Sequence, residues 1–394
     1  MKKEEKFSAD MSYPKNNSYH DGESGNNYII SQPDNTLIVV VVFLVVIGIM
    51  AVFSAGSPKA IASGDNPLVF SIKQFVWLIG GVFFASILSK YDYRKLKTFA
   101  PLACLAVLGA LALVQFSPLG TTVNEAKRWL TIGPVQFQPS EFAKPAVVLA
   151  FSALFSSNVK ILDDKKIPFY FVFLAILLLI FKQPNLSMII LLCMTSMILY
   201  FVAGGGIRVI LTAIATAIPV IAFTILGYQK QRIIVWLDPQ KDPHNAGYNI
   251  IQSLVAFAGG GFFGVGYGNS KQKLSWLPEG HTDFIFSVIA EEFGFLGCFF
   301  IIGLFMMFAY RGFIIAKRCP DMFGKLLAVG ITFSICFQAL MNISVASSFL
   351  PATGIPLPFI SYGGSSLFVS LCMVGVLLNI SKKRVQRIRP YAKY

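Results

Sequence analysis

Long apolar stretches recur along almost the whole chain, and they limit its possible folds more than any other feature. A helix needs about 20 apolar residues to cross the roughly 30 Å hydrocarbon core of a bilayer. Backbone groups in lipid must also pair within their own segment, which favours helices. The sequence therefore predicts an all-α polytopic membrane protein with about ten transmembrane helices, at about 37–55, 70–89, 99–116, 142–157, 168–182, 186–204, 207–227, 284–310, 326–349 and 357–380.

The composition supports this class. Mean hydropathy is +0.66 and 13% of the residues are charged, against about 25% in soluble domains. Anionic lipid of the inner leaflet attracts basic loops and explains the net charge of +14. Because the basic residues are spread over many loops, nucleic acid is not an expected partner.

The distribution of Lys and Arg predicts the orientation. An even number of spans puts both termini on one side, and an inner N-terminus leaves 22 of the 33 Lys and Arg residues in inner segments. We therefore expect both termini to be cytoplasmic. Residues 1–36 are polar and predict a disordered tail, residues 37–381 form the transmembrane domain, and residues 382–394 form a basic tail.

Two outer loops are long, at 117–141 and at about 227–283, the second between helices 7 and 8. Long loops in compact proteins tend to be functional. In the second loop, apolar residues at helical spacing predict a helix that lies in the membrane interface. They are Ile250, Ile251, Leu254, Val255 and Ala258.

Six glycines follow between positions 259 and 268, and they permit backbone conformations closed to other residues. A hinge or turn is the simplest interpretation. The GVGYG string at 264–268 resembles a potassium filter, but the flanking pore helix and fourfold assembly of a filter are not visible. A nucleotide-binding loop is disfavoured because GxxxxGK[ST] is absent, so we expect no nucleotide cofactor.

A polar cluster follows in LPEGHTDFIF. Thr282 and Asp283 stand where a helix N-cap belongs, and an Asp there stabilises a helix by about 1 kcal/mol. Asp283 at the water boundary can equally act as a general base. The nearby Glu279, His281 and Lys273 favour a site, so we take Asp283 as the candidate catalytic residue and these three as candidate substrate-binding residues.

Glu291 and Glu292 would lie ~12 Å further along the same helix. They cannot face lipid without a large cost. A buried pair with helix partners is the favoured interpretation, and a direct substrate role is the alternative.

The loop at 117–141 carries two further candidates. Glu141 and Lys144 are three residues apart, so they predict an ion pair on one helix face, either as a structural bridge or as a wall of a polar cavity. Lys127, Arg128 and Trp129 combine cations with an interfacial aromatic ring. That trio fits phosphate binding or anchoring at headgroup depth equally well.

The last outer loop reads LPATGIPLPFISYGGSS and alternates Pro and Gly with small hydroxyl residues. Non-helical backbone at this depth needs protein or a cavity around it. Packing is its favoured role, with Ser365 as a candidate substrate-binding residue.

Three of these segments resemble signature regions of the SEDS family (shape, elongation, division, sporulation), which includes FtsW, RodA and SpoVE. They are VNEAKRWLTIGPVQFQPSEFAK, GNSKQKLSWLPEGHTDFIFSVIAEEFG and LPATGIPLPFISYGGSSL. The resemblance runs from about residue 37 to 381, and GNSKQKL is more similar to FtsW and SpoVE than to RodA.

The resemblance implies a peptidoglycan glycosyltransferase that polymerises lipid II at the outer face of the bacterial plasma membrane, for septal synthesis in division. It implies a class B penicillin-binding protein transpeptidase and other divisome membrane proteins as partners. Asp283 matches the family's proposed catalytic residue, and Arg128, Glu141 and Lys144 match its cavity residues.

The chain departs from the family pattern at three positions. Asn185 replaces a carboxylate in the segment QPNLS, and Ser344 and Ser348 replace glycines. A role for position 185 in catalysis is therefore in doubt.

For the chemistry, we expect Asp283 to take a proton from the 4-hydroxyl of an acceptor sugar while a polyprenyl pyrophosphate leaves. Arg128, Lys144, Lys273 or a divalent cation, magnesium or manganese, would neutralise the leaving group. A lipid II flippase, with an inward path lined by Glu291 and Glu292, and a non-catalytic division scaffold are the alternatives.

Overall fold

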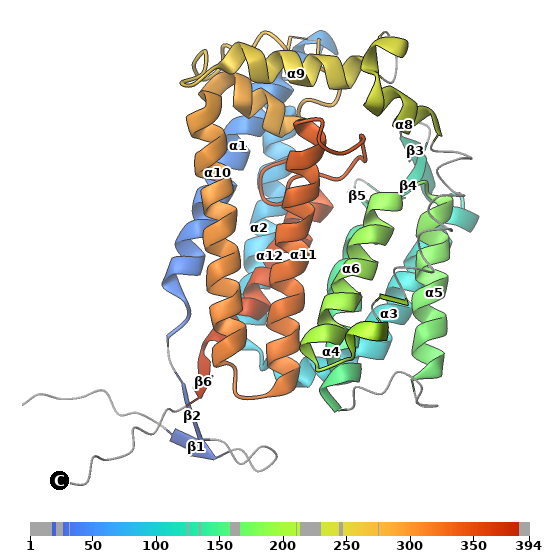
Figure 1. Ribbon diagram of the computed structural model, residues 1–394, viewed down its shortest axis with the longest axis vertical. Coiled ribbons are helices and arrows are strands. Elements are labelled where there is room, and N and C mark those ends of the chain that lie inside the picture. The colour runs from blue at the N-terminus through green and yellow to red at the C-terminus, as the bar shows by residue number, and fades with distance from the viewer. Residues whose placement is uncertain are drawn as a thin grey trace, which may run out of the picture.

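The protein is a bundle of long helices with irregular segments gathered at one end (Figure 1). The computed structural model describes residues 18–20, 27–30, 32–123, 126–133, 135–157, 166–209, 211–212, 230–243, 247–274 and 276–385. The bundle helices are α1 (Asn35–Ala62), α2 (Val69–Lys90), α3 (Tyr93–Phe116), α4 (Pro139–Ser157), α5 (Ile167–Lys182), α6 (Leu186–Val202), α10 (Ile285–Arg318), α11 (Met322–Ala346) and α12 (Gly364–Ser381).

Nine of the ten predicted spans coincide with these helices within the described residues. Six helices are long and apolar enough to cross a membrane, namely α1, α2, α3, α10, α11 and α12, and α5 and α6 are shorter apolar helices. The predicted span at 207–227 lies mostly outside the described residues. The expected polytopic helical class is confirmed.

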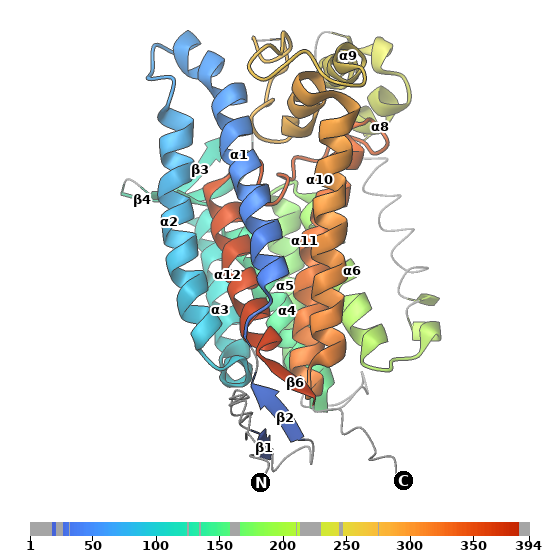
Figure 2. The ribbon, with the colours of Figure 1, turned by 90° about the vertical axis from the view of Figure 1, so that its left-hand side faces the viewer.

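Burial separates central helices from peripheral ones. In α11 and α12, 72% and 78% of the most apolar window is buried, against 11% in α2. The outward face of α2 carries Phe75, Val76 and Ile79, each more than half exposed. Apolar side chains in that position are covered by lipid rather than by protein. Helix α2 therefore forms an outer wall of the bundle (Figure 2).

The outer loop at 117–141 is not irregular, because it folds into a three-stranded antiparallel sheet. Strands β3 (Gly120–Val123), β4 (Ala126–Ile132) and β5 (Val135–Phe137) pair in that order. Thr121 lies opposite Trp129, and Leu130 lies opposite Phe137. The sheet adds a small β element to a chain that the sequence predicted to be all-α.

The segment 230–260 carries three helices: α8 (Lys230–Leu237), the 3₁₀ helix η1 (Pro239–Lys241) and α9 (Tyr248–Gly260). Helix α9 lies across the end of the bundle (Figure 1). Small residues Ser253, Ala256 and Gly260 face the protein, which permits close approach, and the Ser253 hydroxyl bonds that of Ser287 at 2.6 Å. The predicted helix is confirmed, but its apolar stripe divides, because Leu254 and Val255 are exposed.

Helix α10 is interrupted at Gly294, whose φ of 63° and ψ of −162° are not helical. A side chain there would collide with the backbone of Phe262 and Gly264, since a Cβ would lie 2.4 Å from the Gly264 nitrogen. The break separates a short outer segment, 285–293, from the long span that follows. Glu291 and Glu292 therefore lie near the α9 end of the bundle and not deep within one continuous helix.

The described segments nearest the two termini meet at the end of the bundle opposite to α9 (Figures 1 and 2). Strand β2 (Asn27–Ile30) pairs with both β1 (Ser18–His20) and β6 (Lys383–Val385). Strands β1 and β2 lie within the predicted tail 1–36, and β6 lies within the predicted basic tail 382–394. Most other residues of the two tails lie outside the described part of the chain.

The end of α11 generates a stability prediction. Ser348 adopts a φ of +60°, a conformation that costs a non-glycine residue about 1 kcal/mol or more. Ser348→Gly should therefore raise the free energy of unfolding by about 1 kcal/mol, measured by denaturant titration in detergent. Ser347, with a φ of −83°, is the control: if Ser347→Gly stabilised equally, strain at position 348 would not be the cause.

Candidate functional site

A cavity of about 750 Å³ lies at the end of the bundle that carries α9, which is the end predicted to be the outer one. Five parts of the chain form its walls: the end of α1, the first turns of α2, strands β4 and β5 with Gln138 just before α4, the segment 279–283, and the segment 354–366. Asp283, Arg128, Glu279, His281 and Ser365 all line it. Five of the eight candidate site residues, distant in sequence, therefore meet at one opening.

Asp283 is held in place by its backbone rather than by a capping role. The N-cap of α10 is Phe284 and makes no side-chain capping bond, so the capping interpretation of Asp283 is wrong. The Asn342 amide of α11 donates to the carbonyl of Asp283 at 2.8 Å and to that of Ile355 at 2.7 Å. This leaves the Asp283 carboxyl available to the cavity.

Gly354 lies between Asp283 and Arg128. Its φ is +70°, and a Cβ there would lie 3.5 Å from the Asp283 Oδ2 and 3.6 Å from the Arg128 Nη1. The guanidinium is fixed by bonds of 2.7 Å from Nε to the carbonyl of Gln183 and from Nη2 to that of Pro184. Arg128 thus brings a fixed positive charge towards the carboxyl.

The pKa of Asp283 is raised to about 7, chiefly by burial and also by the charge of Glu279, while Arg128 and Arg232 oppose the shift. The side chain is half-buried at the cavity wall. Near neutral pH such a carboxyl is partly ionised and partly protonated. A carboxyl whose pKa lies near the working pH can accept a proton and later release it.

His281 is buried, and burial together with Lys59 lowers its pKa to about 4, so the imidazole is neutral at pH 7. Its ring contacts those of Phe70 and Tyr362 at 4.9 and 5.8 Å between centroids. Glu279 has a φ of +57° and accepts a bond of 2.8 Å from the Thr282 hydroxyl. A strained non-glycine residue of this kind is typical of functional sites.

The segment 354–366 both packs and lines the cavity. The Ser361 hydroxyl donates to the carbonyl of Thr282 at 2.6 Å, and the Tyr362 N–H donates to that of His281 at 3.0 Å. Gln74 of α2 bonds the carbonyl of Ser361 and the N–H of Gly363. Ser365 accepts from the N–H of Gln138 at 3.0 Å. The loop therefore ties α2, the sheet and the Asp283 segment together.

Glu141 and Lys144 form the predicted ion pair, with 2.5 Å between Nζ and Oε2, and both side chains are buried. Lys144 also donates to Gln338 at 2.6 Å, and Gln338 donates to the carbonyl of Pro356 at 2.8 Å. Pro356 lines the cavity, whereas the ion pair does not. The pair is a structural bridge behind the wall, and the expectation that Lys144 faces the leaving group is not met by this geometry.

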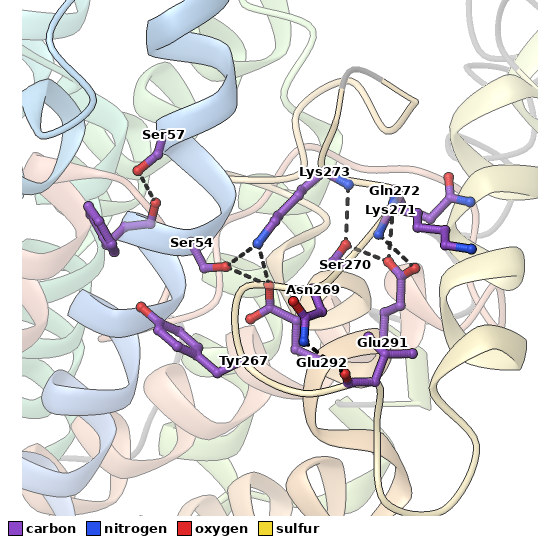
Figure 3. A network of polar contacts seen from close by, with 12 residues as sticks. Ser54, Ser57, Tyr267, Asn269, Ser270, Lys271, Gln272, Lys273, Glu291 and Glu292 are labelled. Carbon is purple, nitrogen blue, oxygen red and sulfur yellow. Dashed lines mark hydrogen bonds and ion pairs between the residues drawn. The ribbon is translucent and has the colours of Figure 1, made fainter.

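Lys273 lies in a different place from the one expected. It forms an ion pair of 2.9 Å with Glu292 and donates to the Ser54 hydroxyl at 2.8 Å (Figure 3). It lines a second cavity of about 530 Å³ with Ser54 and Tyr267. The pair joins α10 to α1, so Lys273 is not beside Asp283.

Glu291 completes this network. Its carboxylate accepts bonds from the Ser270 hydroxyl at 2.5 Å and from the backbone N–H groups of Lys271 and Gln272 (Figure 3). The turn before it contains Gly264, Gly266 and Gly268, each at positive φ, which confirms the turn interpretation of the glycine stretch. The two glutamates are a buried structural pair, as favoured, and their partners lie in the loop before α10 except for Ser54 of α1, which donates to Glu292.

Two further residues acquire structural roles. The Lys127 Nζ donates to the carbonyl of Ser117 at 3.1 Å, just after α3, which is an anchoring role. Asn185 is the N-cap of α6 and accepts from the N–H of Met188 at 3.3 Å. Asn and Asp cap helices equally well, so this role survives the loss of the carboxylate.

Lys59, Lys73 and Trp77 also line the cavity, and sequence reasoning had not selected them. Lys59 lies 3.7 Å from Glu279. Lys73 and Trp77 share one face of α2 at a spacing of four residues. The sequence signal that could have selected these two residues was this spacing, together with a single Lys near one end of an apolar span.

Among the described residues, no group of three or more His, Cys, Asp or Glu side chains is placed to hold a metal ion. The cavity offers the carboxyls of Asp283 and Glu279. Magnesium is commonly held by one or two carboxylates together with substrate phosphates. The donor set therefore fits a cation bound jointly with substrate, not a closed protein cage.

Comparison with known proteins decides the family. A family model described as a cell cycle protein, covering FtsW, RodA and SpoVE, matches residues 34–386. The chain belongs to the FtsW/RodA/SpoVE family. The SEDS resemblance of the three motifs is thereby confirmed over nearly the whole described transmembrane domain.

Relatives of both named types are similar to this chain. A probable peptidoglycan glycosyltransferase FtsW from Trichlorobacter lovleyi is 37% identical over 357 residues, covering 89% of this chain and 94% of its own. Stage V sporulation protein E from Bacillus subtilis is 37% identical over 358 residues, covering 89% and 98%. Both alignments cover about nine-tenths of this chain.

Two solved structures share the fold. A chain from a peptidoglycan synthase complex that coordinates polymerization and crosslinking has a TM-score of 0.73 and 30% identity, covering 89% of this chain and 97% of its own. The rod shape determining protein RodA from Thermus thermophilus has a TM-score of 0.65 and 28% identity, covering 89% and 96%. The arrangement of the helices is therefore that of a known membrane-protein fold.

The ion pair of Lys273 and Glu292 generates a second stability prediction. Lys273→Met would leave Glu292 buried without its cation, and we expect a loss of about 3 kcal/mol in the free energy of unfolding. Adding Glu292→Gln should recover most of that loss. The measurement is denaturant unfolding in detergent.

Lys271 provides the control, since it is exposed on the same loop. Lys271→Met should change stability by less than about 0.5 kcal/mol. A double variant no more stable than Lys273→Met alone would contradict the ion-pair explanation.

Proposed function

We propose that this protein is a peptidoglycan glycosyltransferase that polymerises lipid II into glycan strands at the outer face of the bacterial plasma membrane. The observation that carries the proposal is the carboxyl of Asp283, with a pKa raised to about 7, in a cavity of about 750 Å³ at the outer end of the bundle. Relatives named FtsW as probable peptidoglycan glycosyltransferases support it.

In the proposed reaction, the 4-hydroxyl of the acceptor sugar attacks the anomeric carbon of the donor. The O–H proton passes to the Asp283 carboxylate as the new C–O bond forms, and the bond to the pyrophosphate breaks with its electron pair on the leaving oxygen. A single base is sufficient for this inverting displacement, since a pyrophosphate leaves without a second carboxyl to protonate it.

Other cavity residues have supporting roles. Arg128 presents a fixed positive charge near Asp283 and keeps part of the carboxyl ionised. Glu279, His281 and Ser365 shape the polar wall, and the neutral His281 can donate one hydrogen bond to a sugar. A divalent cation, magnesium or manganese, would be held by Asp283 or Glu279 and would neutralise pyrophosphate charge.

The flippase alternative required an inward path lined by Glu291 and Glu292. Both carboxylates are instead buried and bonded within the outer loop network, and neither lines the Asp283 cavity. These contacts favour polymerisation at the outer face. A scaffold without activity predicts no turnover in any assay.

We further propose that the protein works at the division septum with a class B penicillin-binding protein transpeptidase and other divisome membrane proteins. The similarity to a chain of a peptidoglycan synthase complex supports a partner enzyme. The pairing of β2 with β6 brings the two terminal segments to one end of the bundle, which supports two cytoplasmic termini.

The decisive experiment is polymerisation of labelled lipid II by the purified protein with its transpeptidase partner. Asp283→Asn should reduce the rate of glycan synthesis by at least about 100-fold while lipid II binding is retained, because it removes the base and keeps the shape. Asp238, half-exposed beside Lys241, is the control, and Asp238→Asn should polymerise at the wild-type rate. Unchanged synthesis by Asp283→Asn would eliminate Asp283 as the base.

The pH dependence tests the same group independently. Since the base form of Asp283 appears as pH rises through its pKa of about 7, kcat/KM should rise with an apparent pKa near 7. Glu279→Gln removes a negative charge that raises this pKa, so the rising limb should move to lower pH. His281, with a pKa of about 4, would give no limb near 7. An unshifted limb in Glu279→Gln would assign it to another group.

A further inference from the structure

The cavity has one wall that also faces the bilayer. Ile72, Lys73, Val76 and Trp77 of α2 line it, and the side chains of Ile72 and Val76 are 54% and 64% exposed. Only Gln74 and Gly81 of this helix are buried. The same stripe of α2 therefore borders the polar opening on one side and lipid on the other.

A lipid-linked sugar must extend across this boundary, partly in the cavity and partly in the bilayer. Its polyprenyl chain stays in hydrocarbon, its sugar must reach Asp283, and the diphosphate joins the two. The Asp283 end of the cavity is defined by Arg128 and Gly354, while the α2 stripe supplies the lipid edge. The diphosphate therefore has to lie between them, closest to the α2 wall.

The cationic side chains that line the cavity differ in the protein contacts that they already make. Arg128 is fixed by the carbonyls of Gln183 and Pro184, and Lys59 lies 3.7 Å from Glu279. Within the part of the chain that the structure describes, no ion pair or hydrogen bond holds Lys73. Lys73 is exposed, and its long flexible stem lets the ammonium reach along the wall. It is thus the lining cation that a substrate can engage without breaking a protein contact.

We propose that Lys73 binds the diphosphate of the lipid-linked sugar at the membrane edge of the cavity, with Ile72 and Val76 contacting the first isoprene units. This inference rests on the proposed function, because it places one part of that substrate. Phe70 and Gln74 fix the helix from the opposite side, through the ring of His281 at 4.9 Å and the carbonyl of Ser361 at 3.1 Å. Lys73 therefore stands on a wall braced by the Asp283 segment.

The test compares Lys73→Ala, Lys73→Arg and Lys90→Ala in the lipid II polymerisation assay. Lys90 ends the same helix at its far end and is exposed, so it is a matched control. We expect KM for lipid II to rise about tenfold in Lys73→Ala, because one charge-assisted contact is lost. Lys73→Arg should restore most of it, and Lys90→Ala should behave as wild type.

Competition identifies the group that Lys73 contacts. Added polyprenyl diphosphate should inhibit the wild type at least about tenfold more strongly than polyprenyl alcohol, and Lys73→Ala should lose most of that difference. Equal inhibition of wild type and Lys73→Ala by the diphosphate would overturn the assignment.

An ordinary anionic headgroup is the competing source of phosphate. The assay is therefore run in vesicles of phosphatidylcholine alone and with phosphatidylglycerol added. A defect that persists in phosphatidylcholine supports the substrate diphosphate, whereas a defect confined to phosphatidylglycerol vesicles would show a headgroup contact and overturn the proposal.

The two proposals fail differently. An active wild type with an unchanged KM in Lys73→Ala removes the role of Lys73 and leaves the glycosyltransferase standing. A wild type that binds lipid II without making glycan removes the glycosyltransferase. The binding constants of wild type and Lys73→Ala for lipid II then decide the role of Lys73, with weaker binding by the variant in support and equal binding against.

Discussion

Buried side-chain amides that satisfy non-helical backbone are the interaction on which the rest of this structure depends. Two irregular segments, 279–283 and 354–363, meet at the outer end of a helical bundle, where unpaired carbonyls would be costly. Asn342 joins them by donating to the carbonyls of Asp283 and Ile355. The side-chain amides of Gln338 and Gln74 likewise donate to the carbonyls of Pro356 and Ser361. The positions of the cavity residues follow from these bonds.

Charges around the cavity are divided between support and chemistry. The buried pairs of Glu141 with Lys144 and of Glu292 with Lys273 are each completed by a polar side chain. Such pairs fix geometry more than they add stability. Asp283 has no matching cation at salt-bridge distance among the described residues, and burial raises its pKa. The result is a rigid frame around one carboxyl that can change its protonation state.

Hydrogen bonds and close backbone packing also fix the loop between α9 and α10 to the bundle. The Glu291 carboxylate accepts hydrogen bonds from the Ser270 hydroxyl and from two backbone N–H groups. The turn at Gly264 packs against the break in α10 at Gly294. The loop leads from α9 through this anchor to Glu279 and Asp283. A membrane edge formed by α2 lies on the other side of the cavity.

The length of the apolar runs predicted the membrane-spanning helices, because a bilayer imposes one length and one hydrogen-bonding solution on every span. The motifs around Asp283, Arg128 and Ser365 likewise predicted which segments matter. The three-residue spacing predicted the pair of Glu141 and Lys144, but the sequence could not show that this pair lies behind the cavity wall, that Lys273 is bound by Glu292 and Ser54, or that Lys73 faces the cavity. These outcomes depend on tertiary contacts, such as those of Lys144 with Gln338 and of Lys273 with Ser54, which join positions 194 and 219 apart. A local sequence pattern carries no information on such contacts. Tertiary packing alone decided which cations are committed to the frame and which one remains open to a substrate.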